Sequence, residues 1–416
     1  MSLVDANAQR SDAGAGTAII GIGQSAVGRR LGRSALSLTV DSTLEAIADA
    51  GLSPRDIDGL AAYPGGGVGT PGFAGPMLAE VQDALRLELG WYTSGVEVPG
   101  QLSPIMHADM AIRRGLVRHV LVYRTVTEGS ARAAGRAAPD TGDSKDRTAP
   151  PVPSNRGAIG FGAEGPMQWL SPYGVASAAN WYALHLRRYM HEFGLTRTQL
   201  GALAVSARTK AALNPKAIYR DALTMEHYLS SRMISDPLCL YDCDVPCDGS
   251  TAFVVSAQHA VPDAPHGGVD IVAFGSAAGP RTFRDQLPDP WFGARAAAQM
   301  WAQTDLRPSD VDVAQLYDGF SFLALCWLES LGFCGRGEGG DFIDGGARIA
   351  LDGVLPLNTS GGQLAAGRLH GLGLLHEACL QLRNQAGDRQ VAGAEVAVVA
   401  NGAVPNMGCM LLTRSR

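Results

Sequence analysis

Cysteine is absent from the first 238 residues of this 416-residue chain. The seven cysteines stand at positions 239, 243, 247, 326, 334, 379 and 409, an odd number over a long sequence. Disulfide scaffolds are short and dense in cysteine, so this pattern excludes that class and favours a reducing compartment. Apolar runs that approach the roughly 18 residues of a membrane span are also missing. Residues 1–16 are polar and lack the apolar core of a signal peptide, so we expect a disordered leader on a cytoplasmic protein.

The chain also has little charge of either sign. Charged residues make up 18% of it, and the formal net charge is −6. A nucleic-acid surface needs clustered lysine and arginine, so we expect no nucleic-acid partner. The apolar content of 46% is ordinary for a globular protein and excludes global disorder.

Signature motifs of several enzyme classes are missing as well. The sequence contains no Walker-type phosphate loop, no G-x-S-x-G serine elbow and no H-E-x-x-H zinc motif. A glycine-rich turn follows the apolar run 18–23, but its G-x-G-x₄-G spacing departs from the dinucleotide fingerprint, and we interpret it as a tight turn. Cys239, Cys243 and Cys247 have no evident fourth ligand, so we interpret them as a strand and turn and expect no metal site.

One segment of the first half is repeated in the second. Residues 52–63 and 306–317 share a leucine, a proline, two aspartates and a final tyrosine, and a helical pattern precedes each copy. A second pair supports the repeat, because a helix expected over 105–114 and a strand over 117–123 resemble a helix over 374–383 and a strand over 394–400. The pattern predicts an α/β protein built from two duplicated α/β halves.

An insertion separates these halves. Residues 129–160 are rich in glycine, proline, alanine and serine and show no hydrophobic period, which predicts a long loop. Helical patterns follow over 180–193 and 197–213, the second with Thr196 as its N-cap. We therefore divide the chain into an N-terminal half (17–128 and 248–262), an inserted loop and helical layer (129–247) and a C-terminal half (263–416).

Polar residues gather in three segments of the second half. Tyr317 and Asp318 follow an expected strand and precede an apolar helix expected over 322–330, and ligand crevices of α/β sheets lie at such strand ends. Residues 357–371 combine amides, hydroxyls, paired glycines, an arginine and a histidine before a helix, where backbone N–H groups can stabilise an oxyanion. Asn401 and Gly402 follow the last internal strand and would form a third wall. A structural turn is the alternative for each segment.

Together these features resemble the thiolase superfamily, and within it the branch of sterol-carrier-type thiolases and lipid-transfer proteins, over nearly the whole chain. Members of that branch have approximately His-Asp-Cys-Phe where residues 317–320 here are Tyr-Asp-Gly-Phe. They have Asn-x-x-Gly-Gly at the place of residues 358–362 and Gly-His-Pro at the place of 367–369. The run 332–340 is similar too. The resemblance implies the thiolase-like fold, a five-layered αβαβα arrangement of two duplicated halves.

The catalytic cysteines of thiolases are not matched. The nucleophilic cysteine would fall near residues 98–103 and the second near 400–401, and this chain has no cysteine at either place. Arg368 stands in place of the motif histidine, although His370 follows two residues later. Acyl transfer through a cysteine is therefore excluded, and Ser103 remains as an alternative nucleophile to which the sequence ties no histidine or aspartate.

A thiolase-like site without its thiol can still break the Cα–Cβ bond of a β-hydroxyacyl-CoA, because retro-aldol cleavage needs no acyl-enzyme. It needs a base for the hydroxyl proton, donors for the enolate and an acid for Cα. A thiolase-like site without its thiol resembles that of the steroid side-chain-cleaving aldolases of the same superfamily. These enzymes release a carbonyl steroid and a short acyl-CoA. The resemblance implies Tyr317, His370 and Asp318 as catalytic residues. The substrate-binding residues that it implies are Asn358, Gly361, Gly362, Arg368, Asn401 and Gly402.

The same resemblance implies how the enzyme is assembled. Its substrate would be a coenzyme A thioester, with no further cofactor. The aldolases work with a small partner protein that carries an OB fold and a zinc ribbon, which this chain lacks, and thiolase folds are generally dimers. We therefore expect a homodimer within a heterotetramer. The alternative function is a non-catalytic homologue that binds acyl-CoA or lipid, or a subunit of an acyltransferase complex.

Overall fold

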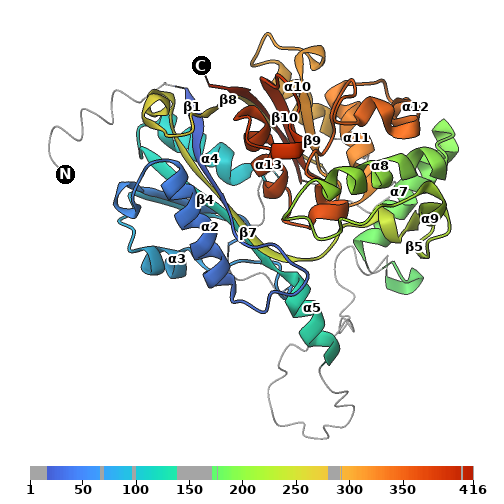
Figure 1. The fold of residues 1–416 in the computed structure, drawn as a ribbon, viewed down its shortest axis with the longest axis horizontal. Coiled ribbons are helices and arrows are strands. Elements are labelled where there is room, and N and C mark those ends of the chain that lie inside the picture. Colours follow the sequence, from blue (N-terminus) through green and yellow to red (C-terminus); the bar gives the residue numbers. More distant parts are fainter. Residues whose placement is uncertain are drawn as a thin grey trace, which may run out of the picture.

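The computed structural model describes residues 16–65, 70–95, 100–137, 171–175, 177–279, 291, 293–403 and 406–415 (Figure 1). The leader expected at residues 1–16 lies outside this part of the chain except for Gly16. Among the described residues, no helix combines the length and the apolar character that a membrane crossing requires.

Nine strands of the described chain form one mixed sheet in the order β3-β2-β4-β7-β1-β8-β11-β10-β9. Its first five strands belong to the N-terminal half and its last four to the C-terminal half. The halves meet where Thr17 and Ile19 of β1 pair with Ile271 and Val269 of β8. The strands are β1 (Thr17–Gln24), β2 (Gly59–Ala62), β3 (Trp91–Ser94), β4 (His119–Thr127), β7 (Asp248–Ala257), β8 (Val269–Ala278), β9 (Val313–Leu316), β10 (Val396–Ala403) and β11 (Asn406–Arg414).

The predicted duplication is confirmed strand by strand. In the N-terminal half β2 runs parallel to β4, which is antiparallel to β7, which is antiparallel to β1. In the C-terminal half β9, β10, β11 and β8 repeat this order and these directions. β2 and β9 moreover occupy the same four positions of the repeated sequence segment.

The two repeated aspartates explain why both copies fold alike. Asp56 closes a short 3₁₀ turn by accepting the backbone N–H of Ser53 at 2.8 Å, and Asp310 does the same for Arg307 at 2.7 Å. The second aspartate of each copy connects the strand that follows it to the parallel neighbouring strand in the sheet. Asp58 accepts the N–H of His119 at the start of β4, and Asp312 accepts the N–H of Val396 at the start of β10. These hydrogen bonds fix the register of the parallel pairs.

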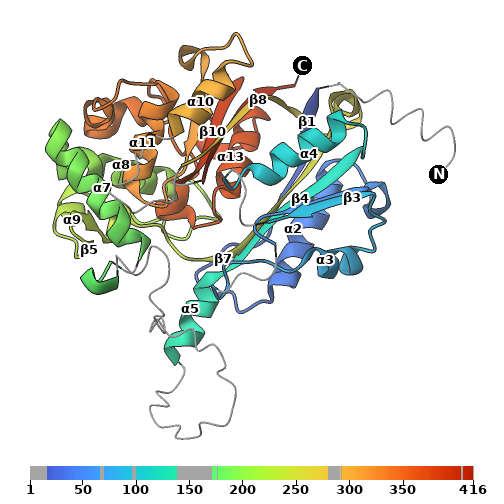
Figure 2. The ribbon, with the colours of Figure 1, turned by 180° about the vertical axis from the view of Figure 1, so that it is seen from behind.

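Helices cover the sheet in layers, as Figures 1 and 2 show. α2 (Ala35–Asp49) and α3 (Leu78–Leu85) pack on the outer face of the N-terminal half, and α10 (Gly293–Trp301) and α11 (Ser321–Leu331) on that of the C-terminal half. α4 (Ser103–Arg113) and α13 (Leu372–Leu382) lie between the two halves, where one apolar core includes both helices. This is the five-layered αβαβα arrangement.

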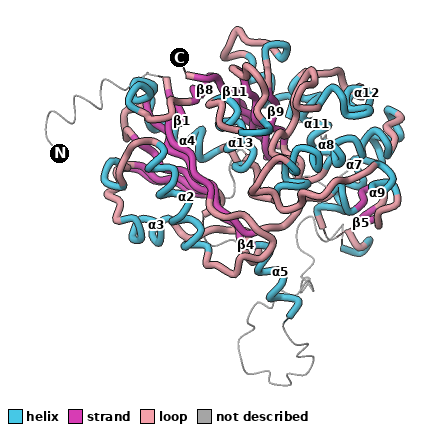
Figure 3. Tube along the Cα trace, viewed as in Figure 1, coloured by secondary structure: helices cyan, strands magenta, loops and turns pink. Residues whose placement is uncertain are grey.

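The inserted layer lies beside the C-terminal half (Figure 3). It contains α7 (Ala178–Phe193), α8 (Arg197–Ala212), α9 (Met225–Leu229) and a small hairpin of β5 (Met233–Ser235) and β6 (Leu238–Cys239). The N-cap prediction is confirmed, because the Thr196 hydroxyl accepts the N–H of Gln199 at 3.2 Å. The short helix α12 (Gly339–Ile343) contacts α8.

The loop predicted over residues 129–160 is wrong at its start. Residues 128–137 form helix α5 (Glu128–Ala137), which continues directly from β4. Alanine and arginine favour helix, and Glu128 stands in the first turn, where a carboxylate is stabilised. The glycines that suggested a loop do not outweigh these preferences. Residues 138–160 lie outside the described chain.

Candidate active site

Tyr317 lies directly after β9, and its backbone N–H donates to Ala400 O of β10 at 2.8 Å. Its side chain is buried, and the ring lies against Gly319, where a Cβ atom would stand 2.7 Å from the ring. Burial and nearby Asp244 raise the pKa of Tyr317 above its ordinary value, although a hydrogen bond from Gln101 opposes the shift. The phenol is therefore protonated at neutral pH and can donate a hydrogen bond.

Glu128 binds two side chains of the 357–371 segment. The Arg368 guanidinium forms a two-pronged ion pair with it, Nε to Oε2 at 2.9 Å and Nη2 to Oε1 at 2.7 Å. The Nε2 atom of His370 lies 3.0 Å from Glu128 Oε2. Arg368 also reaches Asp244 of the inserted layer, Nη1 to Oδ1 at 2.9 Å. This cluster thus joins the N-terminal half, the insertion and the C-terminal half.

Burial decides the charge states within this cluster. It lowers the pKa of His370 to about 3 against the pull of Glu128, so the imidazole is neutral at neutral pH. Burial raises the pKa of Asp244 to about 6, with Arg368 opposing. Burial would also raise the pKa of Glu128, but the hydrogen bond from His370 and the charge of Arg368 bring it down to about 2.

The tautomer of His370 follows from its partner. A carboxylate can only accept a hydrogen bond, so Nε2 of the neutral ring carries the hydrogen that Glu128 receives. Nδ1 then has a free lone pair, and this buried atom has no hydrogen-bond partner in the described structure. The arrangement is that of a histidine base oriented by a carboxylate.

Asp318 accepts hydrogen bonds from the backbone of the neighbouring turn. Its carboxylate accepts the N–H groups of Gln363 at 2.9 Å and Leu364 at 3.4 Å. Burial raises its pKa to about 6, and these N–H groups oppose the rise. A Cβ atom at Gly362 would lie 2.0 Å from Asp318 Oδ2, so only glycine fits there. Asp318 and Gly362 therefore shape the turn that leads to Arg368 and His370.

Asn358 and Gly361 also hold backbone in place. The Asn358 amide donates to Leu316 O at 2.9 Å and accepts its N–H at 2.7 Å, which fixes the end of β9 next to Tyr317. Gly361 has a φ of 97°, and a Cβ atom there would stand 2.6 Å from Ala211 Cβ of α8. Both polar atoms of the Asn358 amide are thus hydrogen-bonded to the backbone of Leu316.

Asn401 is different, because neither atom of its buried amide has a partner in the described part of the chain. It lies against Gly371 at the start of α13, where a Cβ atom would stand 2.4 Å from Asn401 Cγ. Gln101 Oε1 and His370 Nδ1 are also buried without partners. Buried polar atoms are normally paired, so this group marks where a ligand would supply the missing hydrogen bonds. Gly402 instead has its carbonyl bound to Trp327 Nε1 at 3.2 Å.

Ser103 begins α4, and its hydroxyl is buried without a hydrogen-bond partner among the described residues. A serine nucleophile needs a base within hydrogen-bond reach. The structure provides none, so the geometry does not support Ser103 as a nucleophile.

A pocket of about 610 Å³ lies beside the Glu128 cluster, between the inserted layer and the core. Asp244 and Arg368 stand in its wall together with the side chains of Phe320 and Leu364. Its cationic residues are Arg29, Arg132, Arg208, Arg232 and Arg368. A pocket with five arginines favours an anionic ligand.

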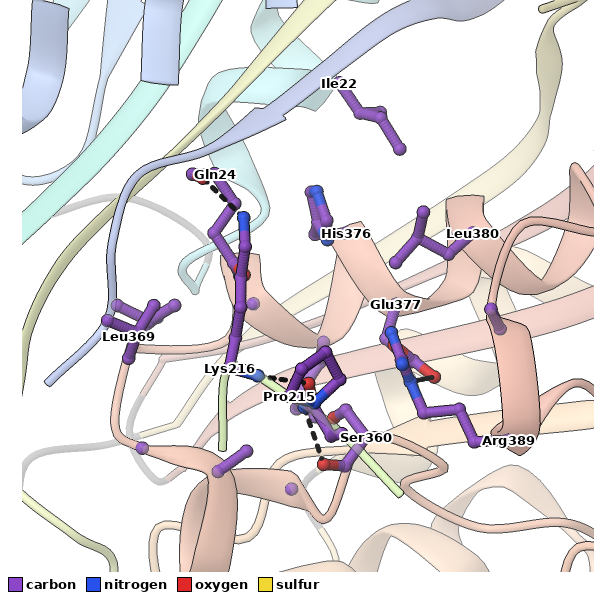
Figure 4. A pocket seen from close by; sticks show the side chains of 18 of the residues that line it. Ile22, Gln24, Pro215, Lys216, Ser360, Leu369, His376, Glu377, Leu380 and Arg389 are labelled. Carbon is purple, nitrogen blue, oxygen red and sulfur yellow. Dashed lines mark hydrogen bonds and ion pairs between the residues drawn. The ribbon is translucent and has the colours of Figure 1, made fainter. Parts of the chain in front are cut away.

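A second pocket of about 710 Å³ lies between β1 and α13 and is larger (Figure 4). Neither Tyr317 nor His370 stands in the wall of either pocket. Its charged side chains bind one another or backbone: Arg389 pairs with Glu377 at 2.9 Å, and Lys216 donates to Gln24 O at 2.6 Å. Burial lowers the pKa of His376 in this wall to about 3. The arginine-lined pocket has more cationic side chains and adjoins the Glu128 cluster, so an anionic ligand fits there better.

Sequence reasoning missed Glu128, Asp244 and Gln101. Glu128 follows the end of β4, as Tyr317 follows β9, so the strand-end rule could have indicated it in the first half. Asp244 and Gln101 lie in irregular segments and carry no such signal. The three cysteines at 239, 243 and 247 are free thiols, and in the described residues no group of His, Cys, Asp and Glu is arranged to hold a metal.

The fold and site define a thiolase-type protein. Residues 287–412 match a family model described as thiolase C-terminal domain-like. The chain is 36% identical to "17-hydroxy-3-oxo-4-pregnene-20-carboxyl-CoA lyase" of Mycobacterium tuberculosis, over 95% of this chain and 98% of that protein. It is 35% identical to "Steroid side-chain-cleaving aldolase" of Thermomonospora curvata, over 95% and 97% of the two chains. The solved structure of the "Ltp2-ChsH2(DUF35) aldolase" superposes with a TM-score of 0.81 and 33% identity, over 97% and 99%.

The chain belongs to the steroid side-chain-cleaving aldolases of the thiolase superfamily. It is a carbon–carbon lyase without the first-half cysteine of thiolases.

Proposed function

We propose that this chain cleaves the Cα–Cβ bond of a β-hydroxyacyl-CoA on a steroid side chain and releases a carbonyl steroid and a short acyl-CoA. The observation that carries the proposal is the neutral imidazole of His370, which Glu128 orients and whose Nδ1 is left without a partner. The protonated phenol of Tyr317 supplies the matching acid. The names of the two relatives support this substrate class.

The reaction balances with these two groups. His370 Nδ1 takes the proton of the β-hydroxyl, the carbon–oxygen bond becomes a carbonyl, and the Cα–Cβ bond breaks. Its electron pair passes to Cα and the thioester as an enolate, towards which unpartnered N–H donors such as the Asn401 amide can point. Tyr317 then gives its proton to Cα. Proton transfer from the imidazolium to the phenolate, through solvent, restores both groups.

The arginine-lined pocket supports coenzyme A as the activating group. The phosphates of coenzyme A are anionic, and five arginines line this pocket next to the Glu128 cluster. We propose that the thioester enters there, with Arg368 and the turn of Gly361 and Gly362 beside it. In this proposal Asn401 and Gly402 also contact the substrate, beyond the wall of the pocket. No further cofactor has a part in this chemistry.

We also propose the assembly in which the chain works. A small partner protein with an OB fold and a zinc ribbon would complete the acyl-CoA site, in line with the second protein named in the similar aldolase structure. A homodimer within a heterotetramer is supported by β3, which ends the sheet with an edge that another strand can pair. The seven free cysteines support the cytoplasm as its location.

The direct test supplies the chain, with and without the candidate partner, with 17-hydroxy-3-oxo-4-pregnene-20-carboxyl-CoA. Breaking its side-chain bond at the hydroxylated carbon yields a 17-keto steroid and propionyl-CoA, which mass spectrometry separates. Replacement His370→Ala should lower turnover by about 10²-fold or more, as expected for loss of a general base.

The matched control is His376→Ala. This histidine is equally buried and neutral but lies in the wall of the second pocket, so its replacement should leave turnover unchanged. Tight binding of the thioester without any carbonyl product would contradict the proposal and favour the acyl-CoA-binding alternative.

A further inference from the structure

Phe73 lies against the imidazole of His370. The two ring centres are 4.7 Å apart and the ring planes meet at 73°, the edge-to-face arrangement that ring pairs favour. The same phenyl ring lies 4.7 Å from the guanidinium of Arg124, a cation–π contact. Phe73 is only partly buried, whereas His370 is 5% exposed. The phenyl ring therefore contributes to the burial of the imidazole.

The segment that carries Phe73 is tied to the end of β4. The Thr127 N–H donates to Gly72 O at 2.8 Å. Gly72 has a φ of 71°, and a Cβ atom there would stand 2.5 Å from Thr127 O and 2.7 Å from the backbone nitrogen of Glu128. Glu128 is also the residue whose carboxylate contacts Nε2 of His370. The end of β4 thus holds in place both the carboxylate and the phenyl ring that contact the imidazole.

His370 stands in an unusual backbone conformation. Its φ is 49°, in the left-handed region that residues other than glycine rarely adopt. Such a conformation persists where the surrounding contacts hold it, and it is typical of functional sites. A hydrogen bond at Nε2 does not by itself fix the plane of the imidazole. The Phe73 contact adds the second constraint, so that the direction of the free Nδ1 atom is set by Glu128 and Phe73 together.

Exclusion of water matters for the charge of this imidazole as well. Burial is the largest influence on the pKa of His370 and lowers it, with Arg124 and Arg368 acting in the same direction and Glu128 in the opposite one. A better hydrated imidazole would take up a proton more readily. The protonated ring has no free lone pair and cannot act as a base.

We propose that Phe73 is a positioning residue for the base: its ring fixes the plane of the His370 imidazole and keeps water from it, so that Nδ1 can accept the proton of the β-hydroxyl. The inference rests on the proposed retro-aldol function and assigns a role to the segment between β2 and α3 of the N-terminal half.

The first test measures the imidazole itself. Nuclear magnetic resonance of isotope-labelled histidine follows its protonation, and the spectrum of His370→Ala assigns the signal. In the parent, His370 should stay neutral down to about pH 5. In Phe73→Ala its pKa should rise by about 1 or more, because water then solvates the charged form. His376, whose pKa burial also lowers, is the internal reference and should titrate as in the parent.

The second test is the kinetics of the retro-aldol reaction at neutral pH. Phe73→Ala should lower kcat about tenfold or more with KM changed less than about threefold, because the proposed role concerns the base and not the binding of the thioester. Phe73→Leu keeps an apolar side chain over the imidazole. It should change the His370 pKa and kcat in the same directions as Phe73→Ala but by less.

Phe342→Ala is the matched control. This phenylalanine of α12 also lies beside an arginine, 4.5 Å from the guanidinium of Arg348, at another place in the apolar core. Its replacement should lower thermal stability and leave the His370 pKa and kcat as in the parent.

Either a parental His370 pKa or a parental kcat in folded Phe73→Ala would overturn the inference. If Phe73→Ala does not fold, parental values of both quantities in Phe73→Leu would overturn it. A raised His370 pKa in Phe73→Ala, found while the parent releases no carbonyl steroid, would support the contact and contradict the proposed function instead.

Discussion

Two buried histidines show how much a single contact changes at the residue scale. Burial lowers the pKa of both His370 and His376 to about 3, so both are neutral at neutral pH. Only His370 has a carboxylate on one ring nitrogen and a free lone pair on the other. The two histidines therefore share a charge state and differ in their orienting partner.

Tyr317 gives the next prediction at this scale. Tyr317→Phe removes the proton donor while keeping the ring against Gly319, so turnover should fall by about 10²-fold or more with little change in KM. The assay is steady-state release of the carbonyl steroid. Unchanged turnover would remove Tyr317 from the mechanism.

Tyr123→Phe is the matched control. This buried phenol donates to Pro76 O at 3.0 Å and lies in the apolar core of the N-terminal half, away from β9. Its loss should cost about 1 kcal/mol of stability, measured by denaturant unfolding, and leave turnover intact.

At the scale of elements, the turns after β9 and before α13 decide where the site residues lie. Asn358 fixes the end of β9, and Asp318 holds the turn that carries Arg368 and His370. The sequence predicted these segments as the site, but most of their polar groups bind backbone. Their task is to place Tyr317 and His370, which is why glycine is required beside them.

Gly319 in the β9–α11 connection tests this view. Gly319→Ala would place a methyl group 2.7 Å from the Tyr317 ring, so the ring has to move. We expect kcat to fall about tenfold or more while the far-ultraviolet circular dichroism stays that of the parent.

Gly135→Ala in α5 serves as its control. No other segment of the described chain lies within 4 Å of the added methyl group, and alanine favours helix, so stability should rise by up to about 1 kcal/mol with parental kcat. A parental kcat in Gly319→Ala would show that the ring position does not matter.

At the scale of the whole molecule, the site exists only where three parts of the chain meet. Glu128 comes from the first half, Asp244 from the inserted layer and Arg368 from the second half. The arginine-lined pocket opens along the same junction. In the proposed function, substrate binding depends on the inserted layer and catalysis on the contact between the halves.

The pocket gives a prediction at this scale. Arg208→Gln removes one charge from α8, so KM for the CoA thioester should rise about three- to tenfold with kcat unchanged. The parent KM should also rise with ionic strength, because salt screens this attraction. Steady-state kinetics at two salt concentrations measure both effects.

Arg187→Gln on α7 is the surface control, since this exposed arginine pairs with Asp236 outside the pocket wall. Equal KM values for Arg208→Gln and the parent would exclude this pocket as the entry of the anionic group.

The sequence by itself determined the duplicated α/β architecture, because the repeated aspartates close turns within their own segments and the apolar runs mark the strands and helices. It also determined the absence of a thiolase nucleophile, and it predicts Tyr317 and His370 as site residues because each lies in a recognisable segment. It contained no sign of Asp244, and it suggested a loop where α5 begins.

Only the tertiary structure decided which polar groups hold the backbone and which are left without a partner. Asn358 and Asn401 carry the same amide group, and Asp318 and Glu128 both carry a carboxylate. Only the neighbouring groups make the members of each pair different. The groups that bury a side chain and form hydrogen bonds with it come from segments more than a hundred residues away in the sequence, as with Arg368 and Glu128. Charge state and free lone pairs follow from those contacts, so no local pattern can contain them.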